Sequence, residues 1–254
     1  MPAEVKILLE GYTNADYFAE NGEERNQPTI SLVRDGDFVI VVDPGVLESQ
    51  QLLIEALEKE NLTVSDVNVV FITHSHIDHY RNIGMFPKAK TLEFFGLWDK
   101  NSVEKWTENF TSNIKVIFTP GHDYTGITLL ATTADGVVAI CGDVFWKENF
   151  PVEPKDDAYA SDIDKLKQSR EMILGVADWV IPGHGKMYKN YKGMVPVKNI
   201  EEDEKQKNFG ICRKCHKIMK TKRDSCKCRQ YLCHHCCECG LDCNNCSCSH
   251  KKDA

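Results

Sequence analysis

The chain has 254 residues, of which 42% are hydrophobic and 27% charged, and its formal net charge is −7. A chain of this length can bury one sizeable core with a small appendage. The apolar run Val5 to Leu9 is too short for a signal-peptide core, and no stretch approaches the length of a membrane span. We therefore expect a soluble, cytoplasmic protein without a membrane partner.

Short segments rich in branched apolar residues predict strands. These are Val5 to Leu9, Thr29 to Val33, Phe38 to Val42, Val69 to Thr73, Ile114 to Thr119, Ile127 to Thr132 and Val137 to Cys141. Two segments show helical spacing instead, Glu48 to Glu60 and the stretch from Tyr159 to Leu174. Asp35-Gly36 and Asp135-Gly136 separate apolar runs and predict hairpin turns. The order of these predicted strands, helices and turns along the chain predicts an α/β fold with a partly antiparallel sheet and helices outside it.

One segment concentrates potential metal ligands directly after the apolar strand Val69 to Ile72. It reads Thr73-His74-Ser75-His76-Ile77-Asp78-His79. An extended backbone over His74 and His76 would point both rings to the same side, and a short helix would then deliver Asp78 and His79. Imidazoles and carboxylates suit zinc, manganese or ferrous iron, so the ligands restrict the metal without naming it.

Three later segments each place a ligand type beside glycine at a strand end. They are Phe118 to His122, Ile140 to Asp143 and Val180 to Gly185. A single His or Asp beside glycine is usually turn chemistry. Together with the upstream cluster, however, His122, Asp143 and His184 predict one shared metal site.

The order HxHxDH, single His, single Asp and last His resembles the metallo-β-lactamase superfamily over roughly residues 5 to 190. The resemblance implies a four-layer αβ/βα sandwich. It also implies two metal ions, the first on His74, His76 and His122 and the second on Asp78, His79 and His184. Asp143 would bridge the two ions, and Asp43 would orient a ligand histidine without touching a metal.

Shorter matches resemble one subgroup of that superfamily, the metallo-β-lactamase domain-containing proteins. They are Leu8 to Tyr12, Asn82 to Pro87 and Gly142 to Phe145. True zinc β-lactamases carry a non-bridging residue where this chain has Asp143, so antibiotic hydrolysis is not expected as the main activity. The superfamily's nucleases with a long inserted domain are excluded, because only forty residues separate Asp143 from His184.

A dinuclear site predicts hydrolysis by a metal-bridging hydroxide, because two cations lower the pKa of a shared water and polarise the substrate. Asp78 is the candidate for orienting the nucleophile and passing a proton to the leaving group. Tyr124 and Thr125 follow His122 and are candidates for donating to a developing oxyanion. For Tyr124 the alternative is an aromatic side chain that packs on the loop.

Eleven of the twelve cysteines fall between Cys212 and Cys248, and their CxxC and CxC pairs favour metal thiolates over disulfides. Their spacing resembles an AN1-type zinc finger and RING-like modules, and departs from both after Cys236. Two or three structural zinc ions would follow. The candidate ligands are Cys212, Cys215, Cys226, Cys228, Cys233, Cys236, Cys239, Cys243, Cys246 and Cys248.

We predict a hydrolase domain over residues 1–197, a charged linker over 198–210 and this zinc-binding module over 211–254. Residues 205–254 carry twelve Lys and Arg against four Asp and Glu, which leaves the preceding body at −15. The basic tail could bind nucleic acid or a protein partner, or serve only as a structural cap. The oligomeric state is open, and a homodimer is compatible with the sequence.

Three functions remain open. The first is a phosphodiesterase acting on RNA, an endoribonuclease, which the resemblance implies and the basic tail allows. The second is a hydrolase of small lactones, esters or thioesters, which the acidic body favours. The third is a zinc-dependent binding protein with an inactive hydrolase fold, which the intact ligand set disfavours.

Overall fold

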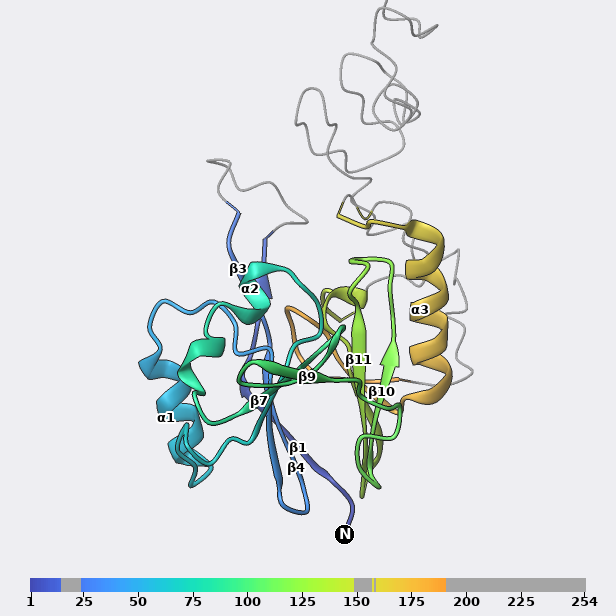
Figure 1. Ribbon diagram of the computed structural model, residues 1–254. Helices are drawn as coiled ribbons and strands as arrows, with labels where there is room; N and C mark the ends of the chain where they lie inside the picture. The colour runs from blue at the N-terminus through green and yellow to red at the C-terminus, as the bar shows by residue number, and fades with distance from the viewer. Residues whose placement is uncertain (15–23, 149–156, 158, 191–254) are drawn as a thin grey trace, which may run out of the picture. The chain divides into compact units, whose positions relative to one another are not determined.

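The computed structural model describes residues 1–14, 24–148, 157 and 159–190 (Figure 1). All of them belong to the first of two compact units, which spans Met1–Gly193. Two sheets pack face to face in this unit, and helices cover their outer faces. The expected mixed α/β architecture is therefore confirmed. The predicted linker and the cysteine-rich module lie outside the described residues, and their boundaries stay predictions.

The first sheet has the strand order β1-β4-β5-β6-β7-β8-β9 among the described residues. Its strands are β1 (Glu4–Leu9), β4 (Ile30–Asp35), β5 (Phe38–Val42), β6 (Val69–Phe71), β7 (Lys90–Glu93), β8 (Gly96–Asp99) and β9 (Ser102–Glu104). Strands β4 and β5 are antiparallel, with Asp35 opposite Phe38, so the predicted Asp35-Gly36 hairpin is confirmed. The next pairs, β5 with β6 and β6 with β7, are parallel.

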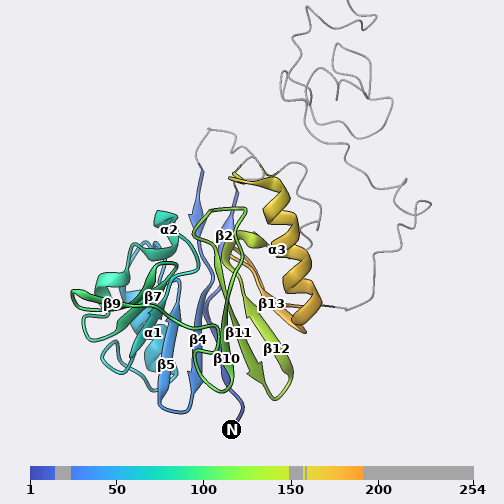
Figure 2. The ribbon, with the colours of Figure 1, turned by 45° about the vertical axis from the view of Figure 1, so that its right-hand side comes forward.

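The second sheet has the order β10-β11-β12-β13-β14 (Figure 2). Its strands are β10 (Ile114–Phe118), β11 (Ile127–Thr133), β12 (Gly136–Ile140), β13 (Trp179–Ile181) and β14 (Tyr188–Lys189). Thr133 lies opposite Gly136, which confirms the second predicted hairpin. Strands β10 and β12 are both antiparallel to β11, and β13 is parallel to β12. Hence β10, β12 and β13 end at the same edge. A two-stranded piece, β2 (Tyr12–Thr13) with β3 (Asn26–Gln27), completes the described strands.

The core has three parts because successive strand residues face opposite sides of a sheet. On β5, Ile40 and Val42 point between the two sheets, while Val41 points outward to helix α1 (Gln51–Lys59). On β12, Val138 and Ile140 likewise point between the sheets, and Ala139 faces helix α3 (Ile163–Val176). Helix, sheet, sheet and helix thus form successive layers (Figure 1).

Three strands of the first sheet were not predicted, namely β7, β8 and β9. Each has at most four residues, and their charged or small side chains are half-buried or exposed at most positions. Strands this short with so few buried positions leave only a weak apolar pattern, and β9 also lies at the edge of the sheet. Two predicted boundaries shift by a few residues, because α1 begins at Gln51 and α3 at Ile163. None of the helices in the described ranges is long and apolar enough to cross a membrane.

Candidate metal centre

The predicted ligands lie on the loops that follow the strands of both sheets. His74 and His76 follow β6, and the four-residue helix α2 (Ile77–Tyr80) then carries Asp78 and His79. From the second sheet, His122 follows β10, Asp143 follows β12 and His184 follows β13. The predicted turn from an extended segment into a short helix is confirmed, since the backbone of His76 is extended at φ −81° and ψ 136°.

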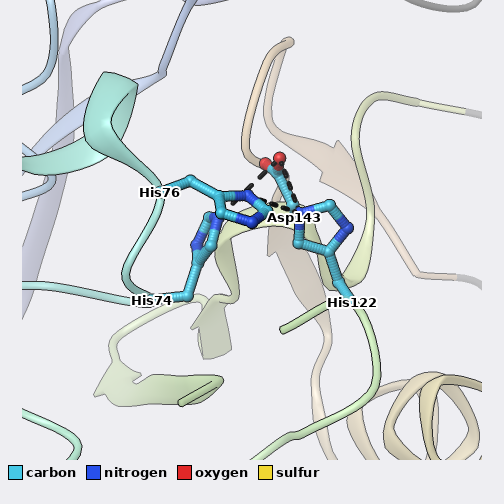
Figure 3. Close-up of side chains that lie close together, drawn as sticks. All are labelled: His74, His76, His122 and Asp143. Carbon is cyan, nitrogen blue, oxygen red and sulfur yellow. Dashed lines mark hydrogen bonds and ion pairs between the residues drawn. The ribbon is translucent and has the colours of Figure 1, made fainter. Parts of the chain in front are cut away.

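A first group of ligand atoms comes from His74, His76, His122 and Asp143, and these atoms all lie within 4.8 Å of one another. Figure 3 shows the three rings and the carboxylate converging on one point. The Nε2 of His122 lies 3.0 Å from the Nδ1 of His76 and 3.4 Å from the Oδ2 of Asp143. The Nε2 of His74 lies 3.9 Å from the same Oδ2.

A second group comes from Asp78, His79 and His184, again with all ligand atoms within 4.8 Å of one another. The Nε2 of His184 lies 3.6 Å from the Oδ2 of Asp78, and the Nε2 of His79 lies 3.8 Å from it. Asp143 stands between the groups. Its Oδ1 is 3.3 Å from the Nε2 of both His79 and His184. Its Oδ2 faces His74 and His122 and also lies 3.3 Å from the Nε2 of His184.

These distances fit divalent cations. A tetrahedral ion with bonds of about 2.0–2.1 Å to nitrogen or oxygen separates its ligand atoms by about 3.3 Å. The contacts of Asp143 with His79, His122 and His184, at 3.3 to 3.4 Å, match that spacing. The Nε2 atoms of His74 and His79 and the Oδ1 of Asp143 are buried and make no hydrogen bond among the described residues. Buried polar atoms without a partner are costly, and a metal ion would satisfy all three.

Asp43 controls the orientation of two ligand histidines. Its carboxylate, 2% exposed as a residue, accepts hydrogen bonds from the Nδ1 of His79 at 2.8 Å and from the hydroxyl of Thr73 at 2.7 Å. Because the Thr73 proton is used on Asp43, the Thr73 oxygen accepts from the Nδ1 of His74, 3.0 Å away. Both rings therefore carry hydrogen on Nδ1 and leave Nε2 free for a metal. Asp43 therefore lies where it can orient ligand histidines. It contacts His79 of the second group directly and His74 of the first group through Thr73.

His184 and His76 are held by different partners. The Nδ1 of His184 donates to the carbonyl of Gln27 at 2.9 Å, so its Nε2 is also free. For His76 the outward Nε2 lies 3.9 Å from the Oδ2 of Asp123, and its Nδ1 is the atom turned inward. Asp123 was missed by sequence reasoning. It lies directly after His122, and only the folded loop shows that it faces a histidine of the other sheet.

Two glycines are required by close approach to the ligands. A Cβ on Gly142 would lie 2.3 Å from the Oγ1 of Thr73, and the residue adopts φ +52°. A Cβ on Gly183 would lie 1.8 Å from the Oδ1 of Asp143. Glycine is therefore needed at these two positions because neighbouring side chains leave no room for a Cβ, as well as because the chain turns there.

The electrostatics suit cation binding. Burial lowers the pKa of His74 well below its ordinary value, so the ring is neutral. Burial raises the pKa of Asp143, but the charges of His184 and His79 outweigh it, and the net pKa is well below the usual range. For His79, burial lowers the pKa, but the carboxylates of Asp143 and Asp43 raise it by more, so the net pKa is well above its ordinary value and the ring must release a proton from Nε2 to bind a metal. The site thus offers a permanent carboxylate among imidazoles.

The two candidate oxyanion donors lie in different surroundings. Tyr124 is 64% exposed, and its ring packs edge-on against Phe94 with centroids 6.1 Å apart. Its role as a donor stays a prediction. Thr125 is buried, and its hydroxyl donates to the Oδ1 of Asp123 and accepts from the backbone N–H of Ser75. The hydroxyl proton of Thr125 is therefore used in a hydrogen bond to Asp123 within the loop that follows His122. The ten tail cysteines predicted to bind zinc lie outside the described residues.

Comparison with known proteins gives consistent matches. The family model for the metallo-beta-lactamase superfamily matches residues 24–93. Metallo-beta-lactamase domain-containing protein 1 of Xenopus laevis is 30% identical over 206 residues, covering 75% of this chain and 83% of the relative. A solved structure from Thermotoga maritima, described as a metallo-beta-lactamase, has a TM-score of 0.59 at 23% identity and covers 74% of this chain and 100% of its own. The dizinc quorum-quenching lactonase AidC has a TM-score of 0.50 at 18% identity and covers 67% and 76%. The last two likenesses concern the fold alone.

Proposed function

This chain belongs to the metallo-β-lactamase superfamily and is a metal-dependent hydrolase, and on that premise we propose that it cleaves phosphodiester bonds in RNA with a dinuclear metal centre. We propose zinc as the resident metal, with manganese or iron as substitutes that the same ligands accept. The observation that carries the proposal is the position of Asp143 between the two groups, where its carboxylate lies 3.3 to 3.4 Å from His122 of the first group and from His79 and His184 of the second.

In this proposal His74, His76 and His122 hold one ion, Asp78, His79 and His184 hold the other, and Asp143 is shared. When bound, a pair of divalent cations polarises the substrate oxygen and lowers the pKa of water, which makes hydrolysis the natural reaction.

The chain's own carboxylates supply the proton chemistry. Asp78 is 20% exposed at its side chain and stands at the open side of the second group, whereas the Asp143 side chain is only 7% exposed. Asp78 can therefore reach a water or a leaving group from the solvent side. We assign it the roles of orienting the nucleophile and carrying a proton to the leaving group.

Two features support RNA as the substrate. Paired metal ions a few ångströms apart are the usual device for clamping the attacking and leaving oxygens of a phosphodiester. In addition, the twelve Lys and Arg of residues 205–254 offer a charge that suits a polyanion. The negative charge of the body limits wide phosphate contact there, so we assign backbone binding to the tail.

A small lactone, ester or thioester is the second candidate substrate. It is favoured by the acidic body and by the fold similarity to AidC, a lactonase with two zinc ions. The two substrates differ in charge. A polyanion would depend on the basic tail and on salt concentration, whereas a neutral lactone would depend on neither.

The test is a turnover screen of the full chain after reconstitution with zinc, manganese or iron. The substrates are an RNA oligonucleotide, its DNA counterpart, decanoyl-homoserine lactone and an acyl thioester. Asp143→Ala is the inactive control. Asp66→Asn is the matched control, because Asp66 is exposed, caps a turn at Thr63 and precedes β6, whereas the ligands follow the other end of that strand. RNA cleavage lost only in Asp143→Ala supports the proposal. Lactone turnover without RNA cleavage replaces it, and two bound metals without any turnover point to a binding protein.

A further inference from the structure

An aromatic pocket lies beside the metal centre. Its volume is about 320 Å³, and Phe94, Phe118, Tyr124 and the Pro120-Gly121 turn form its wall. Gly121 directly precedes the ligand His122 and Tyr124 follows it by two residues, so the pocket shares the loop that carries a ligand of the first group. Binding pockets for small molecules span roughly 300–1,000 Å³. This one lies at the lower end, which suits a single ring system better than an extended chain.

The rings of the wall are held against one another and remain accessible. Phe94 packs edge-on against Phe118, with centroids 5.6 Å apart, and against Tyr124 at 6.1 Å. Trp106 supports Phe118 from behind at 4.8 Å. Phe118 is nevertheless 52% exposed and Tyr124 is 64% exposed. Large rings exposed together in a concavity mark a binding surface, because a soluble protein otherwise buries them.

The pocket also has a polar part to its lining. Ser161, Asp162 and Lys165 line it, where the chain enters α3. The Ser161 hydroxyl donates to the carbonyl of Gly121 at 3.1 Å and keeps its lone pairs available. The ammonium of Lys165 pairs with Asp162 at 3.1 Å, and its side chain is 60% exposed. An alkyl chain seated here would desolvate these groups without replacing their hydrogen bonds, whereas the edge of a nucleobase carries donors and acceptors for them.

The pocket is rigid. The backbone N–H of Asp162 donates to the carbonyl of Gly121 at 2.9 Å, and the Ser169 hydroxyl donates to the carbonyl of Pro120 at 2.6 Å. Gly121 adopts φ +135°, and a Cβ there would lie 2.1 Å from the backbone nitrogen of Leu166. The turn that carries His122 is thus fixed directly on α3, so a ligand in the pocket is positioned relative to the metal ligands.

We propose that this aromatic pocket binds the nucleobase next to the scissile phosphodiester, stacked on Phe118 and Tyr124 with its edge toward Ser161 and Lys165; this rests on the proposed function. Stacking on aromatic side chains tolerates every base, because each base has a π-face. The pocket therefore selects for a nucleotide without imposing a sequence.

The test measures binding of adenosine 5′-monophosphate and of inorganic phosphate to the zinc-loaded full chain by calorimetry. Phe118→Ala and Tyr124→Ala should each weaken nucleotide binding by about 5- to 100-fold, because one stacking contact is lost, and Phe118→Ala should leave phosphate binding unchanged. Both rings are more than half exposed, so their removal should preserve the fold, which thermal melting checks. Phe38→Ala is the matched control, since Phe38 is a partly exposed ring at the start of β5, at the end opposite Asp43.

A parallel assay separates this proposal from the proposed function. The wild type and both variants are titrated with decanoyl-homoserine and assayed on a dinucleotide. Dinucleotide cleavage with nucleotide binding unchanged in both variants overturns the pocket assignment and leaves the phosphodiesterase intact. Nucleotide binding lost in the variants without dinucleotide cleavage supports the pocket and rejects the phosphodiesterase. If the variants lose only decanoyl-homoserine binding, the pocket holds an alkyl chain and the proposal is wrong.

Discussion

Gly183 leaves no room for a side chain beside Asp143, because a Cβ at this position would lie 1.8 Å from the Oδ1 of that carboxylate. The same loop is fixed by the backbone, with the N–H of Gly183 donating to Phe145 and its carbonyl accepting from Thr29. The loop cannot retreat without breaking these bonds. Hence the shared carboxylate must move if a side chain is added.

We expect Gly183→Ala to lose metal binding and turnover while keeping a folded core, since the displaced Asp143 no longer faces both ligand groups. Metal content measured by elemental analysis checks this. Gly175→Ala is the matched control, because a Cβ on Gly175, near the end of α3, meets nothing within 4 Å. The control should keep its metals and gain up to about 1 kcal/mol in stability from the better helix propensity of alanine. A metal-replete, active Gly183→Ala protein would contradict the placement of Asp143.

Asp43→Asn should weaken both metal sites at once. The amide can no longer accept from Thr73 and His79 as a carboxylate does, so the rings of His74 and His79 lose their fixed tautomer. Loss of such a partner lowers metal affinity by about 10- to 100-fold. Competition with a chromophoric chelator measures both affinities, and Asp66→Asn is the control. An affinity change confined to a single metal would show that the link through Thr73 is not operative.

Asp78→Asn and Asp143→Ala should both abolish turnover for different reasons. The amide introduced by Asp78→Asn cannot take up the proton, which predicts a kcat about 10²- to 10⁴-fold lower. Without the Asp143 carboxylate, the two ligand groups lose their shared ligand, and metal content should fall as well. Steady-state kinetics together with metal analysis distinguish the two. Either variant with activity near wild type would make the assigned roles untenable.

The ion pairs of Glu60 should make the stability of the folded domain against unfolding depend on pH. Its carboxylate lies 2.6 Å from Lys6 and 3.2 Å from Arg34, and the hydrogen bond from Lys6 is the main cause that lowers the pKa of Glu60. A lowered folded-state pKa contributes stability that is present above the ordinary pKa of about 4.5 and is lost as the pH falls through the folded value. The difference in melting temperature between wild type and Glu60→Gln should therefore be largest near neutral pH and vanish in acid. Glu58→Gln, at an exposed position of α1, is the matched control variant.

Cutting the chain after residue 204 should leave a folded hydrolase, since all seven predicted ligands precede residue 185. We expect unchanged turnover of small diffusible substrates such as bis(p-nitrophenyl) phosphate and reduced efficiency on RNA, because the twelve basic residues that raise local substrate concentration are removed. A high salt concentration should lower the efficiency of the full chain on RNA, as the truncation does, and leave turnover of small substrates unchanged. Equal RNA cleavage by both forms at every salt concentration would assign the tail to a protein partner, and an unfolded product would make the tail structural.

Much of the fold could be predicted from local patterns. Apolar strands such as Phe38–Val42 and Ile127–Thr133 alternate between two packed faces, and their branched residues mark them in the sequence. The ligand loops could also be predicted, because each follows a strand and contains glycine or a His-rich run. Whether Asp143 would face both groups could not be read from spacing, since that depends on the docking of two sheets.

The remaining features depend on contacts between distant segments. Phe94 and Phe118 form one wall of the aromatic pocket although they come from segments of the chain that belong to different sheets, and nothing periodic links them in the sequence. Asp123 looks like an ordinary loop residue until its carboxylate is seen 3.9 Å from His76. Such pairs are created by the packing of the sheets, and one sequence carries no local signal for them.

The ligands fall into two blocks along the chain, with His74 to His79 after a strand of the first sheet and His122, Asp143 and His184 after strands of the second. During synthesis, a nascent chain that has released only the first sheet holds three histidines and one aspartate but lacks the carboxylate shared by both groups. The first group would be complete only once the loops of His122 and Asp143 have been synthesised and have docked, and the second group would also need the later loop of His184. Complete metal coordination would therefore require synthesis of both sheets and their docking on each other.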